Sequence, residues 1–180
     1  AGVGAMATQA RVDPSFGLKA LGLLRAGMNA PDALRALAAT DSAWDSRQLG
    51  IVDARGGVAS WTGKKCLDWA GSETGVDFAC QGNILAGPAV VSGMAKAYRA
   101  TKGELAQRLV AALDAAQAAG GDKRGMQSAA LIVVRPSPTH PQFTQRYIDL
   151  RVEDHKDPIK ELRRLLQIQE GFHGADNHIL

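Results

Sequence analysis

Residues 120–134, which read GGDKRGMQSAALIVV, join an alanine-rich segment to the most apolar part of the chain. The two glycines are expected to end a helix, because glycine readily takes the left-handed conformation at a helix C-terminus. Asp122, Lys123 and Arg124 then crowd a short turn, and the apolar run Leu131–Val134 predicts a strand buried on both faces. A charged turn at the mouth of a buried strand is typical of a functional site, and a plain solvated connector is the alternative.

Length and composition indicate a single domain over residues 1–180. Of the 180 residues, 46% are hydrophobic and only 5% aromatic, so small aliphatic side chains must fill most of the core. The net charge of +3 comes from 21 basic and 18 acidic residues that are interleaved, which speaks against a nucleic-acid partner. No apolar run has the length of a membrane span and no signal peptide is visible. We expect a soluble protein without a membrane partner, with the cytoplasm favoured.

The cysteines and histidines form no recognisable metal site. Cys66 and Cys80 lack metal-ligand spacing, so two free thiols are expected, with a bridge between them as the alternative. Ser128 has no strand–turn–helix elbow around it, which argues against a serine-hydrolase triad. Neither zinc spacing nor a convincing general base is found among the four histidines, His140, His155, His173 and His178. The sequence therefore predicts no metal and no cofactor, and metal-dependent hydrolysis has no support.

Periodicity, capping residues and turn signals divide the chain into helices and strands. The predicted strands are Ala5–Gln9, Gln48–Asp53, Val58–Thr62, Val76–Cys80, Leu131–Val134 and Tyr147–Val152. The predicted helices are 14–27, Ala30–Ala39, Pro88–Ala100, Glu104–Ala119 and Pro158–Glu170, with a proline-rich loop at Pro136–Pro141 and a frayed tail from Gly171. Strands and helices come in groups, which favours an α+β layered fold over alternating βαβ units.

Amide and hydroxyl side chains gather at the predicted strand ends. They form three pairs, with two charged residues near the last: Thr8 and Gln9, Gln81 and Asn83, Gln127 and Ser128, and then Asp122 and Arg124. Side-chain amides can donate hydrogen bonds to a developing oxyanion, and they can equally tie down turns. Three such pairs in one small domain predict a polar pocket.

Several blocks of the sequence together resemble one family. They are residues 1–10 (AGVGAMATQA), 47–50 (RQLG), Thr62-Gly63 with Cys66 and Trp69-Ala70-Gly71, 81–87 (QGNILAG), 120–129 (GGDKRGMQSA) and 147–152 (YIDLRV). They resemble an uncharacterised, mainly bacterial and archaeal family, domain-of-unknown-function family 1028, which is grouped with the N-terminal-nucleophile (Ntn) hydrolases. The resemblance covers nearly the whole chain.

The resemblance implies a four-layer αββα sandwich, in which two mainly antiparallel sheets stack between helix pairs. In Ntn hydrolases the first residue of the mature chain is Thr, Ser or Cys, and its own α-amine serves as the base for attack on an amide bond. That chemistry is reasonable because an α-amino group titrates near neutral pH. Ala1 has no nucleophilic atom. The family pattern therefore implies an upstream segment with the opening strands and a Thr. That segment is expected to be a separate N-terminal chain, to be disordered, or to have been lost by clipping.

The resemblance also assigns roles to the candidate site. Asn83 and Gln127 would supply oxyanion or substrate hydrogen bonds, and Asp122 would orient the amine or nucleophile. Arg124 would pair with a substrate carboxylate. The remaining substrate-binding candidates are Thr8, Gln9, Gln81 and Ser128. The function expected is an Ntn-type hydrolase of an amide bond in a small substrate, with self-association left open. The alternative is a non-catalytic ligand-binding or assembly module with the same fold.

Overall fold

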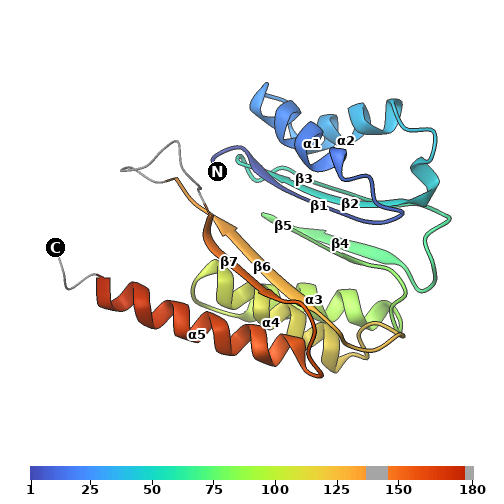
Figure 1. Ribbon diagram of the computed structural model, residues 1–180. Coiled ribbons are helices and arrows are strands. Elements are labelled where there is room, and N and C mark those ends of the chain that lie inside the picture. The colour runs from blue at the N-terminus through green and yellow to red at the C-terminus, as the bar shows by residue number, and fades with distance from the viewer. Residues whose placement is uncertain (137–145, 177–180) are drawn as a thin grey trace.

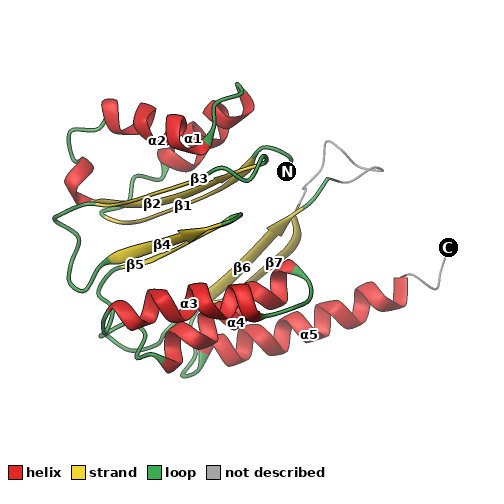
Figure 2. Ribbon diagram, turned by 180° about the vertical axis from the view of Figure 1, so that it is seen from behind, coloured by secondary structure: helices red, strands yellow, loops and turns green. Residues whose placement is uncertain are grey.

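Helices form the two outer layers of the molecule and strands form the two inner layers (Figures 1 and 2). The structure, a computed structural model, describes residues 1–136 and 146–176. The helices are α1 (Ser15–Arg25), α2 (Ala30–Ala39), α3 (Pro88–Ala100), α4 (Leu105–Ala118) and α5 (Pro158–Asp176), with a short 3-10 helix η1 (Trp44–Ser46). The strands are β1 (Gly4–Ala10), β2 (Arg47–Asp53), β3 (Val58–Thr62), β4 (Gly71–Gly75), β5 (Phe78–Gly82), β6 (Ala129–Val134) and β7 (Arg146–Val152).

Each pairing between the strands is antiparallel, in the orders β1-β2-β3, β4-β5 and β6-β7. Helices α1 and α2 cover the outer face of the three-stranded sheet, and β4-β5 lies against its inner face (Figure 2). Helix α3 then covers β4-β5, with side chains of α4 completing the core between them, while α4 and α5 cover β6-β7. The α+β sandwich with four layers, αββα, that the resemblance implies is therefore confirmed.

Local capping signals place α1 and α2 as predicted. The Asp13 carboxylate accepts a hydrogen bond from the Ser15 backbone at 2.9 Å, at the start of α1. The Asn29 side chain accepts from the Asp32 backbone at 2.8 Å, which satisfies an otherwise unpaired amide in the first turn of α2. The apolar faces of both helices then pack on the sheet β1-β2-β3. The largest buried side chains of this core include Phe16, Leu37, Leu49 and Ile51.

A buried carboxylate holds the β2–β3 hairpin against α2. Asp53, 6% exposed, accepts hydrogen bonds from the backbone amides of Ala30 at 2.8 Å, Arg55 at 2.8 Å and Gly57 at 3.0 Å. These hydrogen bonds hold the pKa of Asp53 below its ordinary value, and the bond from the Ala30 amide contributes most to the lowering. A Cβ at Gly57 would overlap the Asp53 carboxylate, so the turn requires glycine there. The predicted hairpin is confirmed.

The β4–β5 hairpin differs from the sequence prediction. The predicted strand Val76–Cys80 begins two residues too early, because Val76 and Asp77 form the turn, with Asp77 at φ 63°. Strand β4, Gly71–Gly75, was missed because it carries no apolar alternation. Both cysteines are free, as expected. Burial raises the pKa of the Cys80 thiol to about 11, so it remains protonated within this core.

Strand β6 is covered on one face only. Leu131 and Val133 pack against α4 and α5, whereas Ile132 and Val134 are 49% and 42% exposed. The prediction of a strand buried on both faces is therefore wrong, because no layer of the described residues covers the second face of β6. The preceding glycines behave as predicted: Gly120 and Gly121 have φ of +108° and +55° where α4 ends.

Helix α5 is longer than predicted. It begins at Pro158, where the Asp157 carboxylate caps the Lys160 backbone amide at 3.3 Å, and it continues through the expected frayed tail to Asp176. Within the described residues, none of the helices combines the length and the apolar character needed to cross a membrane. The proline-rich loop beyond Pro136 and the histidines His140 and His178 lie outside the described residues.

Candidate functional site

An open groove runs beneath β1 and beside β5. Within residues 1–136 and 146–176, β5 is paired only with β4 and β6 only with β7, so each of the two strands has one free edge. Figures 1 and 2 show β6 diverging from β5 across this space. The side chains of Ala5 and Ala7 on the β1 face above it are exposed. In the other half of the sandwich, β4-β5 covers the corresponding faces of β2 and β3.

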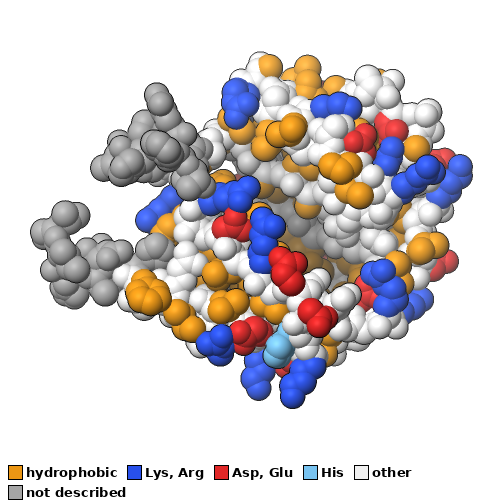
Figure 3. Space-filling model, in the orientation of Figure 1, with side chains coloured by type: hydrophobic (Ala, Val, Ile, Leu, Met, Phe, Trp, Pro, Cys, Tyr) orange, Lys and Arg blue, Asp and Glu red, His pale blue; other side chains and the backbone are white. Residues whose placement is uncertain are grey.

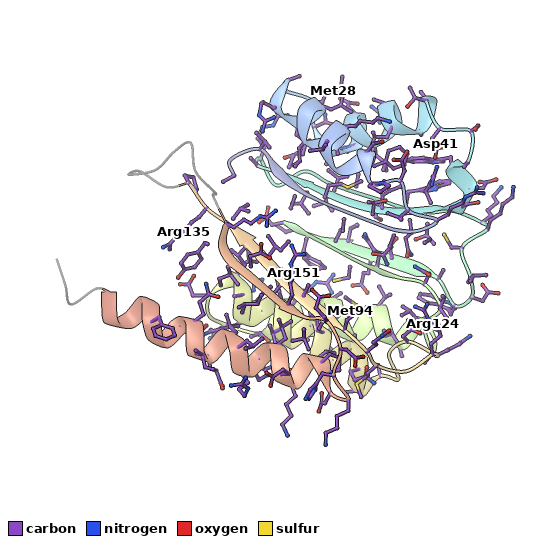
Figure 4. All side chains as sticks on the ribbon, viewed as in Figure 1. Met28, Asp41, Met94, Arg124, Arg135 and Arg151 are labelled. Atoms are coloured by element: carbon purple, nitrogen blue, oxygen red, sulfur yellow. The ribbon has the colours of Figure 1, made fainter. Side chains whose placement is uncertain are left out.

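The groove contains a cavity of about 960 Å³ (Figure 3). Its floor is apolar and comes from the inward faces of α3 and α4: Val90, Met94, Leu113 and Ala116. Its walls are polar and come from the ends of β1 and β5 and from the loop that leads into β6. Figure 4 labels Met94, which rises from α3, and Arg124, which lies on that loop. The arrangement is an apolar floor with polar groups at the rim, as in many ligand sites.

One end of the groove is closed by backbone hydrogen bonds. Leu85 and Asp122 form an isolated antiparallel bridge between the loop after β5 and the loop before β6. The Ala86 amide donates to the Gly121 carbonyl at 2.9 Å, and the Lys123 amide donates to the Ile84 carbonyl at 2.8 Å. The predicted site stretches around Asn83 and Asp122 are therefore held together, although they are far apart in the sequence.

A buried glutamine organises the closed end. Gln48 on β2 is fully buried, and its Nε2 lies 2.8 Å from the Gly82 carbonyl, 3.2 Å from the Gly71 carbonyl and 3.0 Å from Thr62 Oγ1. Its Oε1 accepts hydrogen bonds from Gln9 Nε2 at 2.9 Å and from Asn83 Nδ2 at 3.0 Å. Gln48 thus joins the two stacked sheets and fixes two side chains that line the cavity.

Gln81 contributes a third amide to the same end. Its Nε2 donates to the Ala7 carbonyl at 3.4 Å, and its Oε1 is buried without a hydrogen-bond partner in the described part of the chain. The side chain lies over Gly50, where a Cβ would overlap Oε1. The absence of a side chain at position 50 therefore makes room for the Gln81 amide.

Asp122 and Arg124 pair with each other. The Arg124 guanidinium donates to both carboxylate oxygens, from Nε at 3.0 Å and from a terminal nitrogen at 2.6 Å, and its backbone amide donates at 2.8 Å. The hydrogen bond from the Arg124 side chain is the largest cause that lowers the pKa of Asp122. In return, the same hydrogen bond raises the pKa of Arg124. The pair is solvent-accessible at the rim, so Arg124 must leave Asp122, in whole or in part, to bind a substrate carboxylate.

Six of the eight candidate site residues line the cavity: Gln9, Gln81, Asn83, Asp122, Arg124 and Ser128. Thr8 does not, because it lies opposite Leu49 in the register and so faces the α1–α2 core, where its Oγ1 has no partner in the described structure. Gln127 does not either. Its side chain is exposed, and its backbone carbonyl accepts a hydrogen bond from the His155 amide at 2.9 Å.

Sequence reasoning missed Gln48 as part of the site. Its role depends on partners 14 to 39 residues away, which no local pattern reveals. One signal was present, since Gln48 opens the predicted strand Gln48–Asp53. A polar side chain in a strand that two layers bury must find hydrogen-bond partners.

The cavity has a thiol but no activated nucleophile in the described residues. Cys66 lines the wall, and its Sγ donates to the Arg47 carbonyl at 3.3 Å. Burial raises the pKa of this thiol, which disfavours the reactive thiolate. No histidine of the described chain lines the cavity, and its Asp, Glu, His and Cys side chains form no group of three that could hold a metal ion. In the described residues, the cavity wall therefore offers polar groups that can hydrogen-bond a ligand, without an activated nucleophile among them.

Comparisons with known proteins identify the family. Residues 1–162 match the family of unknown function DUF1028. The fold is similar to the crystal structure of protein SPO2555 from Silicibacter pomeroyi, of the same family, with a TM-score of 0.82 and 32% sequence identity. The match covers 92% of this chain and 70% of that one. No curated protein matches the sequence significantly. The chain therefore belongs to the DUF1028 family.

Proposed function

We propose that the protein is an Ntn-type hydrolase of an amide bond in a small substrate, with its nucleophile on a polypeptide segment that precedes Ala1. The observation that carries the proposal is the groove between β5 and β6, with its apolar floor and its cluster of polar groups at the closed end. The segment would enter as an extended strand and bring its first residue to the amide cluster.

The surroundings of the groove favour a strand as the occupant. A strand edge presents a row of backbone donors and acceptors, and an edge beside an apolar floor is normally paired or covered. Here β5 offers such an edge, β1 lies above the groove, and Val90, Met94 and Leu113 lie below it. One inserted strand would pair with β5, cover the exposed β1 face and bury the helix side chains.

The closed end supplies groups suited to acyl transfer. The hydroxyl of an N-terminal Thr would attack the amide carbonyl, and its proton would pass to the α-amine and then to the leaving nitrogen. Water would next hydrolyse the acyl-enzyme. Asn83 Nδ2 uses one hydrogen on Gln48 and has a second for the oxyanion. Asp122 would orient the amine, and Arg124 would exchange from Asp122 to a substrate carboxylate.

The first test concerns the polypeptide itself. Intact-mass measurement and N-terminal sequencing of the protein purified from its native cells should find a second fragment that begins with Thr. A protein that begins at Ala1, has no second fragment and releases no amine from any small amide would contradict the proposal.

The second test measures turnover of the protein that contains the segment. Release of ammonia or amine from a panel of small amides should fall about 100-fold or more in Asn83→Ala, because an oxyanion donor is lost. Asp122→Ala should also lower the rate, while Gln167→Ala, on the exposed side of α5, should leave it unchanged. Wild-type rates in Asn83→Ala and Asp122→Ala would overturn these roles. Ligand binding without turnover in the wild type would favour the non-catalytic module.

A further inference from the structure

The hydrogen bonds of Gln48 determine which way the neighbouring amides point. The carbonyls of Gly71 and Gly82 can only accept, so the Gln48 atom that lies 3.2 Å and 2.8 Å from them must be the NH₂ nitrogen. Gln48 Oε1 must then face Gln9 and Asn83, and an oxygen acceptor requires a donor from each. Both of these side chains therefore turn their NH₂ groups inward, and their carbonyl oxygens are left for other partners.

Gln81 has the same polarity for an independent reason. The Ala7 carbonyl fixes the Gln81 NH₂ group, and Gln81 Oε1 is left buried without a donor in the described chain. Gln81 Oε1 lies against Gly50, so it can accept from a ligand only after the side chain rotates toward the cavity, and that bond would recover the free energy that an unpaired buried amide oxygen costs. Gln9 and Asn83 thus line the closed end of the cavity with amide oxygens that Gln48 leaves unpaired, and Gln81 adds a third acceptor that lies behind them against Gly50.

We infer that this acceptor cluster, oriented by Gln48, is a binding site for a primary ammonium group. The three N–H bonds of a primary ammonium group match several neutral acceptor oxygens, whereas a carboxylate would find no donor in those oxygens and only the second N–H of an amide such as Asn83. The inference rests on the proposed function for the assignment of the cavity as the site. The inference adds to that function the chemical group that the site recognises. This group is either the α-ammonium of an N-terminal residue or an amine carried by the substrate.

Gln48 is a positioning residue in this account, because it contacts the two amides and not the ligand. Gln48→Met would keep the length of the side chain and remove both the acceptor and the donor. Gln9 and Asn83 would then be free to rotate and to present NH₂ groups to the cavity. The expected result is a loss of selectivity for ammonium over carboxylate ligands.

The experiment uses the ¹⁵N-labelled 180-residue chain and follows the side-chain NH₂ signals of Gln9, Gln81 and Asn83 by NMR during titration with methylammonium chloride. Saturable shifts of these signals are expected, with no saturable shift for tetramethylammonium, which has the charge but no N–H donor. Sodium acetate should not shift them either. An equal response to tetramethylammonium, or no response to methylammonium, would overturn the inference.

Variants separate recognition from folding. Gln9→Met removes one acceptor and should weaken methylammonium binding about tenfold, as expected for a hydrogen bond to a charged group. Gln167→Met, a matched change on the surface of α5, should bind as the wild type does. Unchanged affinity in Gln9→Met with an intact spectrum would contradict the site. None of these measurements requires turnover. The proposed ammonium site can therefore be disproved without disproving the proposed hydrolase activity, and the hydrolase activity can be disproved without disproving the ammonium site.

The source of the ammonium group is identified by adding the upstream segment. A segment with a free α-amine should abolish the methylammonium shifts if its own ammonium occupies the site. An N-terminally acetylated segment should leave them in place. Methylammonium binding that survives with the free segment would assign the site to an amine of the substrate.

Discussion

Strands β2 and β6 have similar apolar sequences but different surroundings. Strand β2, with the run LGIV, is paired on both sides and covered on both faces, and six of its seven residues are buried. Within residues 1–136 and 146–176, strand β6, with the run LIVV, is paired only with β7 and covered only by α4 and α5. The difference shows that an apolar sequence indicates a tendency of the strand to be buried. The number of its faces that become buried depends on the layers that lie next to it. The half of the molecule with incomplete layers is also the half that contains the groove.

The largest expected effect comes from matched truncations in the two strands. Ile51 on β2 is fully buried and Ile132 on β6 is 49% exposed. Ile51→Ala should lower the free energy of unfolding by about 3–4 kcal/mol, because it leaves a cavity in a closed core. Ile132→Ala should cost less than about 1 kcal/mol, since much of that side chain already contacts water. Urea unfolding followed by circular dichroism measures both, and equal losses would refute the contrast.

A second comparison uses two carboxylates with lowered pKa values. Asp53 is buried in the closed half and accepts three backbone hydrogen bonds, whereas Asp122 lies at the rim in an accessible pair with Arg124. Asp53→Asn should destabilise the protein by about 2 kcal/mol at neutral pH, because a charged acceptor is lost. Asp122→Asn should have a much smaller effect, since water screens the exposed pair.

The pH dependence follows from the direction of the Asp53 shift. A carboxyl whose pKa is lower in the folded state stabilises the protein above its unfolded pKa, which is about 4. That contribution is lost as pH falls through the lowered folded pKa. Unfolding measured from pH 6 to pH 2 should therefore show a steeper acid loss in the wild type than in Asp53→Asn. Parallel curves for the two proteins would assign the acid sensitivity to other groups.

The smallest expected change in stability concerns Gly50. A Cβ at this position would overlap Gln81 Oε1, the far end of a side chain that can rotate into the cavity. Gly50→Ala should therefore change the unfolding free energy by less than about 1 kcal/mol and weaken methylammonium binding. Gly22→Ala, at a helical position with open space, should stabilise by about 0.5–1 kcal/mol without affecting binding. Unchanged binding in Gly50→Ala would remove Gln81 from the acceptor cluster.

Elements with local signals could be predicted from the sequence. The caps at Asn29 and Asp157 and the Gly-Gly turn after β2 act through residues two to four positions away, and the structure has them as expected. Strand β4 lacked such a signal, because its pairing with β5 and its packing against β3 come from other segments. The open face of β6 was missed for the same reason.

The candidate site was predicted as a set of strand-end residues, and most of them line one cavity. The sequence could not reveal the orientation of each side chain. Thr8 and Gln9 are neighbours on β1 and face opposite sides, because successive side chains in a strand alternate. Gln48 was missed because its five contacts come from β1, β3, β4, β5 and the loop after β5.

We propose that an upstream strand completes the edges of β5 and β6 that are free within the described residues, and amide hydrogen exchange tests this proposal most directly. In the 180-residue chain alone, the amides of β2 should be protected, while the groove-facing amides of β5 and β6 should exchange much faster. Addition of the segment that precedes Ala1 should slow exchange in β5 and β6 and leave β2 unchanged. Full protection of both edges without the segment, or no change on its addition, would contradict the account.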